Sequence, residues 1–145
     1  MLLHRDPEFS VIDAPSILGL RPTGVELLPK ALKAAGLLER LKADYAGMVA
    51  PTSAYNYKRD DGTGLLNPQA IRDYTLKLAD AVNGELRKNK FPIVIGGDCS
   101  ILIGNILALR RLGRYGLFFI DGHSDYYLPE ESSTGEVADM DLAIV

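Results

Sequence analysis

The sequence has little of what marks secreted, membrane-spanning or nucleic-acid-binding proteins. Its single cysteine, Cys99, excludes an intrachain disulfide framework and favours a reducing, cytoplasmic compartment. It has no run of about 18 apolar residues, so we expect no membrane-spanning helix. Arg5, Asp6 and Glu8 interrupt any early apolar segment, so we expect no signal peptide. The net charge of −3, without a basic patch, argues against binding to nucleic acid or to an anionic membrane.

The chain does have enough apolar residues to form one domain. With 145 residues, of which 47% are hydrophobic, it fits a single globular domain spanning residues 1–145. Asn67 is expected to cap a long helix that has Pro68 in its first turn. Alternating strands and helices favour an α/β fold with an open parallel sheet and flanking helices. The expected strands cover residues 9–12, 44–51, 91–95 and 115–120, and the expected helices cover residues 28–35, 37–41, 68–86 and 101–112.

Two polar segments follow the last two expected strands, at the edge where parallel sheets bind ligands. Residues 96–100 read Gly-Gly-Asp-Cys-Ser, and residues 121–125 read Asp-Gly-His-Ser-Asp. In extended backbone Asp121, His123 and Asp125 share one face, because every second side chain points the same way. Without a cation nearby, two carboxylates and an imidazole this close together would repel one another or compete for protons. With a divalent cation they become its ligands. The alternative is an ordinary polar turn in which His123 makes a simple hydrogen bond.

Cys99 follows a glycine pair at the expected start of a helix, where backbone N–H groups favour negative charge. A lowered pKa there would produce a thiolate, which is either a nucleophile or a soft metal ligand. A nucleophile also needs a histidine base, but His4 lies near the terminus and His123 is better used as a ligand. The remaining possibility is that Cys99 is buried and packs like a small apolar residue, so its role stays open.

Together, residues 96–100 and 121–125 resemble the N-terminal half of the arginase–agmatinase–formiminoglutamase (ureohydrolase) family. Residues 24–37, the helix after Asn67 and residues 134–140 resemble further regions of that family. The resemblance implies a three-layer α/β/α fold and a metal-dependent hydrolase. In such enzymes, paired Mn²⁺ ions share a bridging hydroxide that attacks a guanidino or formimino carbon and cleaves a C–N bond. The resemblance also implies a homo-oligomer.

The resemblance assigns metal-binding roles to four residues. Asp121 would bridge both ions, and Asp125 and His123 would each bind one, with Asp125 also the catalytic residue. Cys99 stands where most members have a histidine ligand. Because a thiolate is a softer ligand, Zn²⁺ or Fe²⁺ comes into consideration beside Mn²⁺.

The positions that would contact the substrate depart from the arginase pattern. Tyr127 and Glu136 stand where arginases have asparagines, and Ala138 replaces a histidine linked to proton transfer. Tyr127 and Glu136 are therefore the candidate substrate-binding residues, and arginine itself is not the expected substrate. Glu136 either meets a cationic group of the substrate or is simply solvated.

The later Asp-x-Asp motif of the family, which completes both metal sites, would lie beyond Val145. We therefore expect an apparently truncated fold that corresponds to the N-terminal portion of the domain. On this interpretation the 145-residue chain binds divalent metal weakly and hydrolyses nothing measurable. The alternative is a non-catalytic arginase-fold paralogue that serves binding or assembly.

Overall fold

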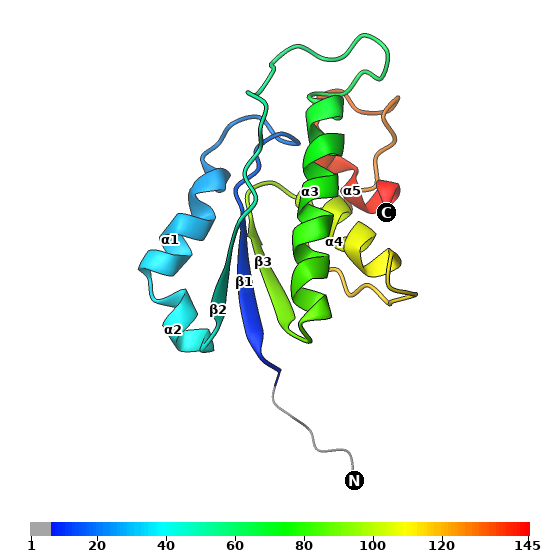
Figure 1. The fold of residues 1–145 in the computed structure, drawn as a ribbon. Helices are drawn as coiled ribbons and strands as arrows, with labels where there is room; N and C mark the ends of the chain where they lie inside the picture. The colour runs from blue at the N-terminus through cyan, green and yellow to red at the C-terminus, as the bar shows by residue number, and fades with distance from the viewer. Residues whose placement is uncertain (1–6) are drawn as a thin grey trace.

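The computed structural model describes residues 7–145 and has a parallel sheet at its centre (Figure 1). Its strands are β1 (Phe9–Ala14), β2 (Asp44–Met48) and β3 (Phe91–Gly96), in the order β2-β1-β3. Both neighbours pair with β1 in parallel, so Val11 lies opposite Tyr45 on one side and Ile93 on the other. The parallel α/β fold expected from the sequence is confirmed. His4, Arg5 and Asp6, named above, lie outside the described residues.

Helices cover both faces of the sheet, which gives the three α/β/α layers (Figure 1). The helices α1 and α2 lie on one face, and α3 and α4 pack against each other on the opposite face. Within residues 7–145, no helix is long and apolar enough to span a bilayer. The bounds are η1 (Val25–Leu27), α1 (Leu28–Ala34), α2 (Leu37–Leu41), α3 (Pro68–Arg87), α4 (Ile101–Arg110), η2 (Val137–Asp139) and α5 (Asp141–Ile144).

The helix α3 begins where the sequence predicts, but Asn67 does not cap it as expected. Asn67 has a left-handed φ of 51°, and its side chain makes no capping hydrogen bond. Instead, its Nδ2 donates to the carbonyl oxygen of Leu18 at 3.0 Å, and its Oδ1 accepts the backbone N–H of Asn56 at 2.7 Å. The amide therefore joins two loops to the start of α3, because it finds buried backbone partners outside the helix.

The core lies between β1 and the helices α3 and α4. Ile12 on β1, Leu78 on α3 and Met140 before α5 are buried and belong to one apolar cluster. The two helices approach closely at Gly104, where an added Cβ would lie 3.0 Å from the side chain of Leu78. Met140 thus anchors the C-terminal segment in the same core that supports the sheet.

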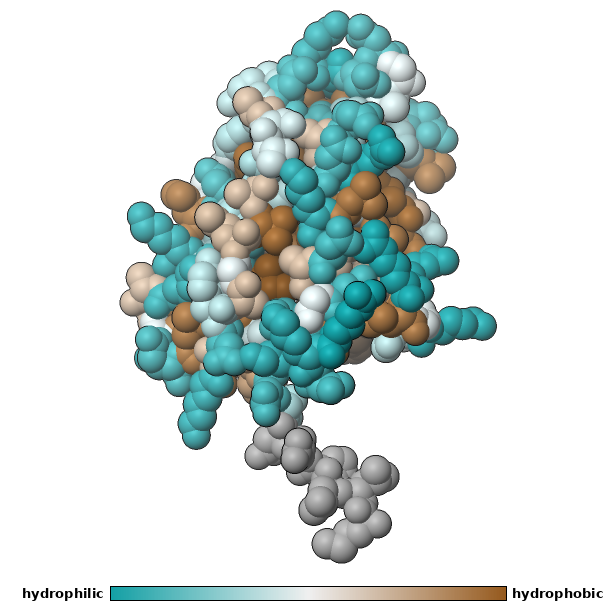
Figure 2. All heavy atoms as spheres, in the orientation of Figure 1, coloured by the Kyte–Doolittle hydropathy of each residue, from teal (hydrophilic) through white to brown (hydrophobic). Residues whose placement is uncertain are grey.

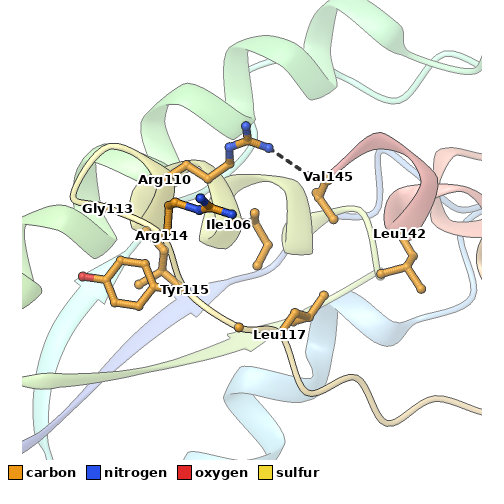
Figure 3. Close-up of a pocket in the computed structure, with 10 residues that line it drawn as sticks. Ile106, Arg110, Gly113, Arg114, Tyr115, Leu117, Leu142 and Val145 are labelled. Carbon is orange, nitrogen blue, oxygen red and sulfur yellow. Dashed lines mark hydrogen bonds between the residues drawn. The ribbon is translucent and has the colours of Figure 1, made fainter.

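The expected buried strand over residues 115–120 is wrong, because this segment forms no strand in the structure. The side chains of Phe118 and Ile120 are exposed at 87% and 83%. A buried strand needs apolar partners on both faces. Here the segment stands away from α4 and leaves a hollow of about 460 Å³, lined among others by Leu117 and Leu142 (Figure 3). Hydrophobic atoms also reach the surface on the side of the molecule that carries α4 (Figure 2).

Candidate metal centre

The turn after β3 brings the polar segment 96–100 against the loop after β1. A Cβ on Gly97 would lie 1.7 Å from the carbonyl oxygen of Ser16, so only glycine fits there. The Gly97 N–H donates to the carbonyl of Ala14 at 3.2 Å, and the Asp98 N–H donates to the carbonyl of Ser16 at 3.0 Å. The close backbone approach predicted for the glycine pair is therefore present at Gly97.

The side chain of Asp98 fixes this turn rather than pointing to a ligand. Its Oδ2 accepts the backbone N–H of Gly19 at 3.2 Å, and its Oδ1 accepts the N–H of Ser100 at 2.9 Å. Only 2% of Asp98 is exposed. The first bond ties Asp98, just before Cys99, to the loop after β1, and the second fixes the backbone of Ser100, just after Cys99.

Three side chains from the two polar segments converge at this turn. The Sγ of Cys99 and one carboxylate oxygen each of Asp121 and Asp125 all lie within 4.8 Å of one another. Asp125 is buried, and its Oδ2 has no hydrogen-bond partner. We call Cys99, Asp121 and Asp125 the carboxylate–thiol cluster.

His123 lies apart from the carboxylate–thiol cluster. Its side chain is 87% exposed, and its Nδ1 lies 3.5 Å from Oδ1 of Asp121. The expectation that a strand presents all three side chains on one face is wrong, because residues 121–125 form bends instead of extended structure. Asp125 joins Asp121 through a left-handed backbone with φ 46°, a conformation that aspartate tolerates better than most residues.

A further acidic residue, Asp141, was not found by sequence reasoning, and it precedes Leu142, whose backbone N–H donates to the carbonyl oxygen of Asp125 at 3.1 Å. It is completely buried, and neither of its carboxylate oxygens has a hydrogen-bond partner. Burial raises the pKa of Asp141 to about 7, the negative charge of Asp125 adds to the rise, and the N–H of Leu142 opposes it. The available signal was an aspartate inside the otherwise apolar residues 140–145.

The acidic surroundings also act on Cys99 and Asp125 of the carboxylate–thiol cluster. Desolvation raises the pKa of the Cys99 thiol to about 11, and the charges of Asp141 and Asp125 add to it. Cys99 as a residue is exposed, and its Sγ lies within 4.8 Å of a carboxylate oxygen of Asp121 and of Asp125. Desolvation likewise raises the pKa of Asp125, with Asp121 adding to the rise and His123 opposing it. Without a cation the thiol is therefore protonated at neutral pH.

This donor set fits a divalent cation. Within residues 7–145, no ion pair neutralises Asp125 or Asp141, although both are buried. Unpaired buried carboxylates are costly, and a bound cation is one of the few ways to compensate them. Carboxylate oxygens suit hard ions such as Mn²⁺ or Mg²⁺, and a thiolate adds affinity for softer ions.

The two candidate substrate-binding residues have different surroundings. Tyr127 is exposed, and its backbone N–H donates to the carbonyl of Asp139 at 3.3 Å. Glu136 is buried, so it is not simply solvated. Its Oε1 accepts the backbone N–H of Arg21 at 3.1 Å and lies 3.6 Å from the Nε of the same residue. Neither residue belongs to the carboxylate–thiol cluster.

Comparison with known proteins shows which family this chain and its fold resemble. A family model described as the arginase family matches residues 8–139. The arginase of Staphylococcus aureus (strain COL) is 35% identical over 142 residues, which cover 93% of this chain and 47% of that protein. The native arginase structure of Bacillus caldovelox at pH 5.6 has a TM-score of 0.81 at 33% identity, covering 94% of this chain and 48% of that one. The Entamoeba histolytica arginase in complex with L-ornithine has a TM-score of 0.76 at 28% identity, with the same coverage of both chains.

The chain spans about half the length of the curated relatives it matches. Within that span, the family match covers all three strands and the helices on both faces of the sheet. The sequence match and the shared fold agree, and we conclude that this chain belongs to the arginase family.

Proposed function

We propose that the protein containing this chain is a metal-dependent hydrolase of the ureohydrolase type, which cleaves a C–N bond of a guanidino or formimino compound. The observation that carries the proposal is the convergence of Cys99, Asp121 and Asp125 within 4.8 Å of one another. Membership of the arginase family supports the same reaction class. The relatives described above are arginases, so a guanidino compound is the first substrate class to test.

Asp121 and Asp125 would hold the divalent ion, with Cys99 as a softer third ligand. His123 would join them by rotating its exposed side chain toward the ion. We propose Mn²⁺ as the metal, with Zn²⁺ or Fe²⁺ as alternatives if the thiolate binds. When bound, such an ion lowers the pKa of a water molecule and polarises the carbon that is attacked. The carboxylate of Asp125, buried and without a protein partner, is placed to accept a proton at its Oδ2.

The substrate would be recognised by Glu136 and Tyr127. A cationic guanidino or amino group would compete with Arg21 for the carboxylate of Glu136, which now accepts the Arg21 N–H. Tyr127 offers an exposed ring and hydroxyl on the neighbouring segment. Ala138 stands where arginases have a histidine, so we propose a substrate other than arginine.

We propose that the 145-residue chain alone hydrolyses nothing measurable. Its match to about half the length of the arginases supports this. The family usually assembles into homo-oligomers, and we propose the same here.

The test is urea and formamide release from a panel of guanidino and formimino compounds. The protein should be assayed as its gene produces it, in Mn²⁺ and in Zn²⁺, beside Asp125→Asn. We expect release from at least one compound and loss of at least a hundredfold in the variant. A folded, metal-loaded protein that releases neither product from any compound would contradict the proposal.

Two observations favour a second candidate, a non-catalytic paralogue used for binding or assembly. Cys99 stands where most members of the family have a histidine ligand, and Ala138 cannot transfer a proton. Metal titration of the wild type against Cys99→Ser separates the cases. Equal affinities for Mn²⁺ and Zn²⁺ in both proteins would show that Cys99 is not a ligand and would favour the second candidate.

A further inference from the structure

The side chain of Arg59 joins two loops next to the candidate substrate-binding residue Glu136. Its Nη1 donates to the carbonyl oxygen of Ser133 and its Nη2 to that of Ser132, each at 3.1 Å. Its Nε donates to the carbonyl oxygen of Gly64. A guanidinium group presents its N–H donors in one rigid plane, so a single side chain can hold three carbonyl groups at once.

The two loops also meet through their backbones, at Gly135. This glycine has a left-handed φ of 75°, and an added Cβ would lie 2.6 Å from the carbonyl oxygen of Gly64 and 2.8 Å from the Nε of Arg59. The backbone N–H of Leu66 donates to the carbonyl oxygen of Gly135 at 2.7 Å. Residues 132–135 therefore cannot shift without losing contacts to the loop that carries Arg59.

The held segment leads directly into Glu136, which is buried. The backbone N–H of Glu136 donates to the hydroxyl of Thr134 at 3.1 Å, so its position is set from within residues 132–135. Its Oε1 accepts the backbone N–H of Arg21 at 3.1 Å. A binding group works well only when it is held within about 0.5 Å of its productive position.

We propose that Arg59 is a positioning residue for substrate recognition. It fixes residues 132–135 and so sets where the carboxylate of Glu136 meets a cationic group of the substrate. This rests on the substrate role given to Glu136 under the proposed function. The hydrogen bonds of Arg59 go to backbone oxygens and not to the carboxylate–thiol cluster, so its removal acts on substrate binding more than on the chemical step.

Steady-state kinetics of the protein as its gene produces it test this assignment, with Arg59→Ala, Arg59→Lys and the control Lys58→Ala. We expect both Arg59 variants to raise KM at least tenfold with kcat within threefold, because one ammonium group cannot replace three planar bonds. Lys58 is exposed and pairs only with the exposed Asp61 at 3.0 Å, so its variant should keep the wild-type KM. An unchanged KM in Arg59→Ala, or a loss confined to kcat, would overturn the assignment.

A double-mutant cycle with Glu136→Gln separates positioning from general support of the fold. If Arg59 acts through Glu136, Arg59→Ala should raise KM less than threefold further once the Glu136 carboxylate is gone. Effects on KM that simply multiply would mean that Arg59 does not act through Glu136, which would overturn the proposal.

Hydrogen exchange of the Leu66 amide gives a readout that needs no turnover. We expect exchange at least tenfold faster in Arg59→Ala and unchanged in Lys58→Ala, because Arg59 holds the loop whose Gly135 carbonyl accepts this N–H. Unchanged exchange in Arg59→Ala would overturn the positioning role even if the enzyme is active. Faster exchange in a protein whose wild type hydrolyses no compound would instead overturn the proposed function, and the role of Arg59 in substrate recognition with it.

Discussion

The Oδ2 of Asp98 accepts a hydrogen bond of 3.2 Å from the backbone N–H of Gly19, which joins the turn after β3 to the loop after β1. The two residues are 79 positions apart in the sequence, and Asp98 directly precedes Cys99 of the candidate metal centre. The position of Cys99 therefore depends on a contact made by the residue before it.

Replacing Asp98 with alanine should destabilise the fold by about 2–4 kcal/mol, because it leaves the N–H groups of Gly19 and Ser100 without acceptors in a buried region. Urea denaturation measures the loss. Asp60 makes a similar turn on the surface, where its Oδ1 accepts the N–H of Thr63 at 2.8 Å, and Asp60→Ala should cost much less because water replaces the bond. Equal losses in the two variants would contradict the role given to Asp98.

Gly97→Ala should destabilise the protein by about 3 kcal/mol or more, or prevent folding, because the new Cβ would lie 1.7 Å from the Ser16 carbonyl oxygen. The matched control is Gly84→Ala in α3, where nothing lies within 4 Å of the added Cβ. That substitution should stabilise by about 0.5–1 kcal/mol, since alanine favours a helix. Chemical denaturation of both variants checks the prediction, and a well-folded Gly97→Ala would refute it.

Glu85 should make the stability depend on pH in the acid range. The Lys88 ammonium donates to Oε1 of Glu85 at 2.6 Å and lowers the pKa of this carboxyl below its ordinary value of 4.5. A lowered folded-state pKa adds stability above pH 4.5, and the addition is lost as the pH falls through the folded pKa. Glu85→Gln should thus cost about 0.5–1 kcal/mol at pH 7, and the difference should vanish in strong acid.

The control for that prediction is Asp61→Asn, which breaks the pair between Lys58 and Asp61, both of them exposed. Denaturation curves at several pH values should show no measurable change in this variant. A constant difference between wild type and Glu85→Gln at every pH would mean that the charge of Glu85 does not act as described.

Removing His123 should weaken metal binding less than removing Asp125. The imidazole is 87% exposed and must be ordered before it can reach an ion, whereas the Asp125 carboxylate is already buried in place. We expect His123→Ala to cost less than tenfold in Mn²⁺ affinity and Asp125→Asn tenfold or more. The reverse order in a calorimetric titration would mean that residues 121–125 rearrange when the ion binds.

Local signals in the sequence predicted most of the fold. The short apolar run of β3 is typical of a buried strand. The spacing of Ile71, Tyr74 and Leu78 in α3 matches the 3.6-residue period of a helix. Residues 115–120 carry the same kind of apolar run but form no strand, since pairing depends on neighbours that a local pattern does not contain. The capping of α3 failed for the same reason: Asn67 bonds to distant loops.

The candidate site was predictable in part. The three members of the carboxylate–thiol cluster carry motif signals, but the bend that joins Asp121 to Asp125 was not visible in the spacing. Asp141 belongs to no recognisable sequence motif. Its burial could not be predicted because it depends on how α5 packs on α4. The metal identity, the homo-oligomer and the cytoplasmic location remain predictions.

The most direct measurement of the central claim is anomalous diffraction from crystals of the chain soaked in Mn²⁺ or Zn²⁺. We predict a peak between Cys99, Asp121 and Asp125, about 2.0–2.4 Å from the carboxylate oxygens. The peak should be absent in Asp125→Asn crystals grown and soaked in the same way. An ion bound elsewhere in the crystal would contradict the assignment of the site. So would the absence of any bound ion in a crystal form in which solvent can reach these three side chains.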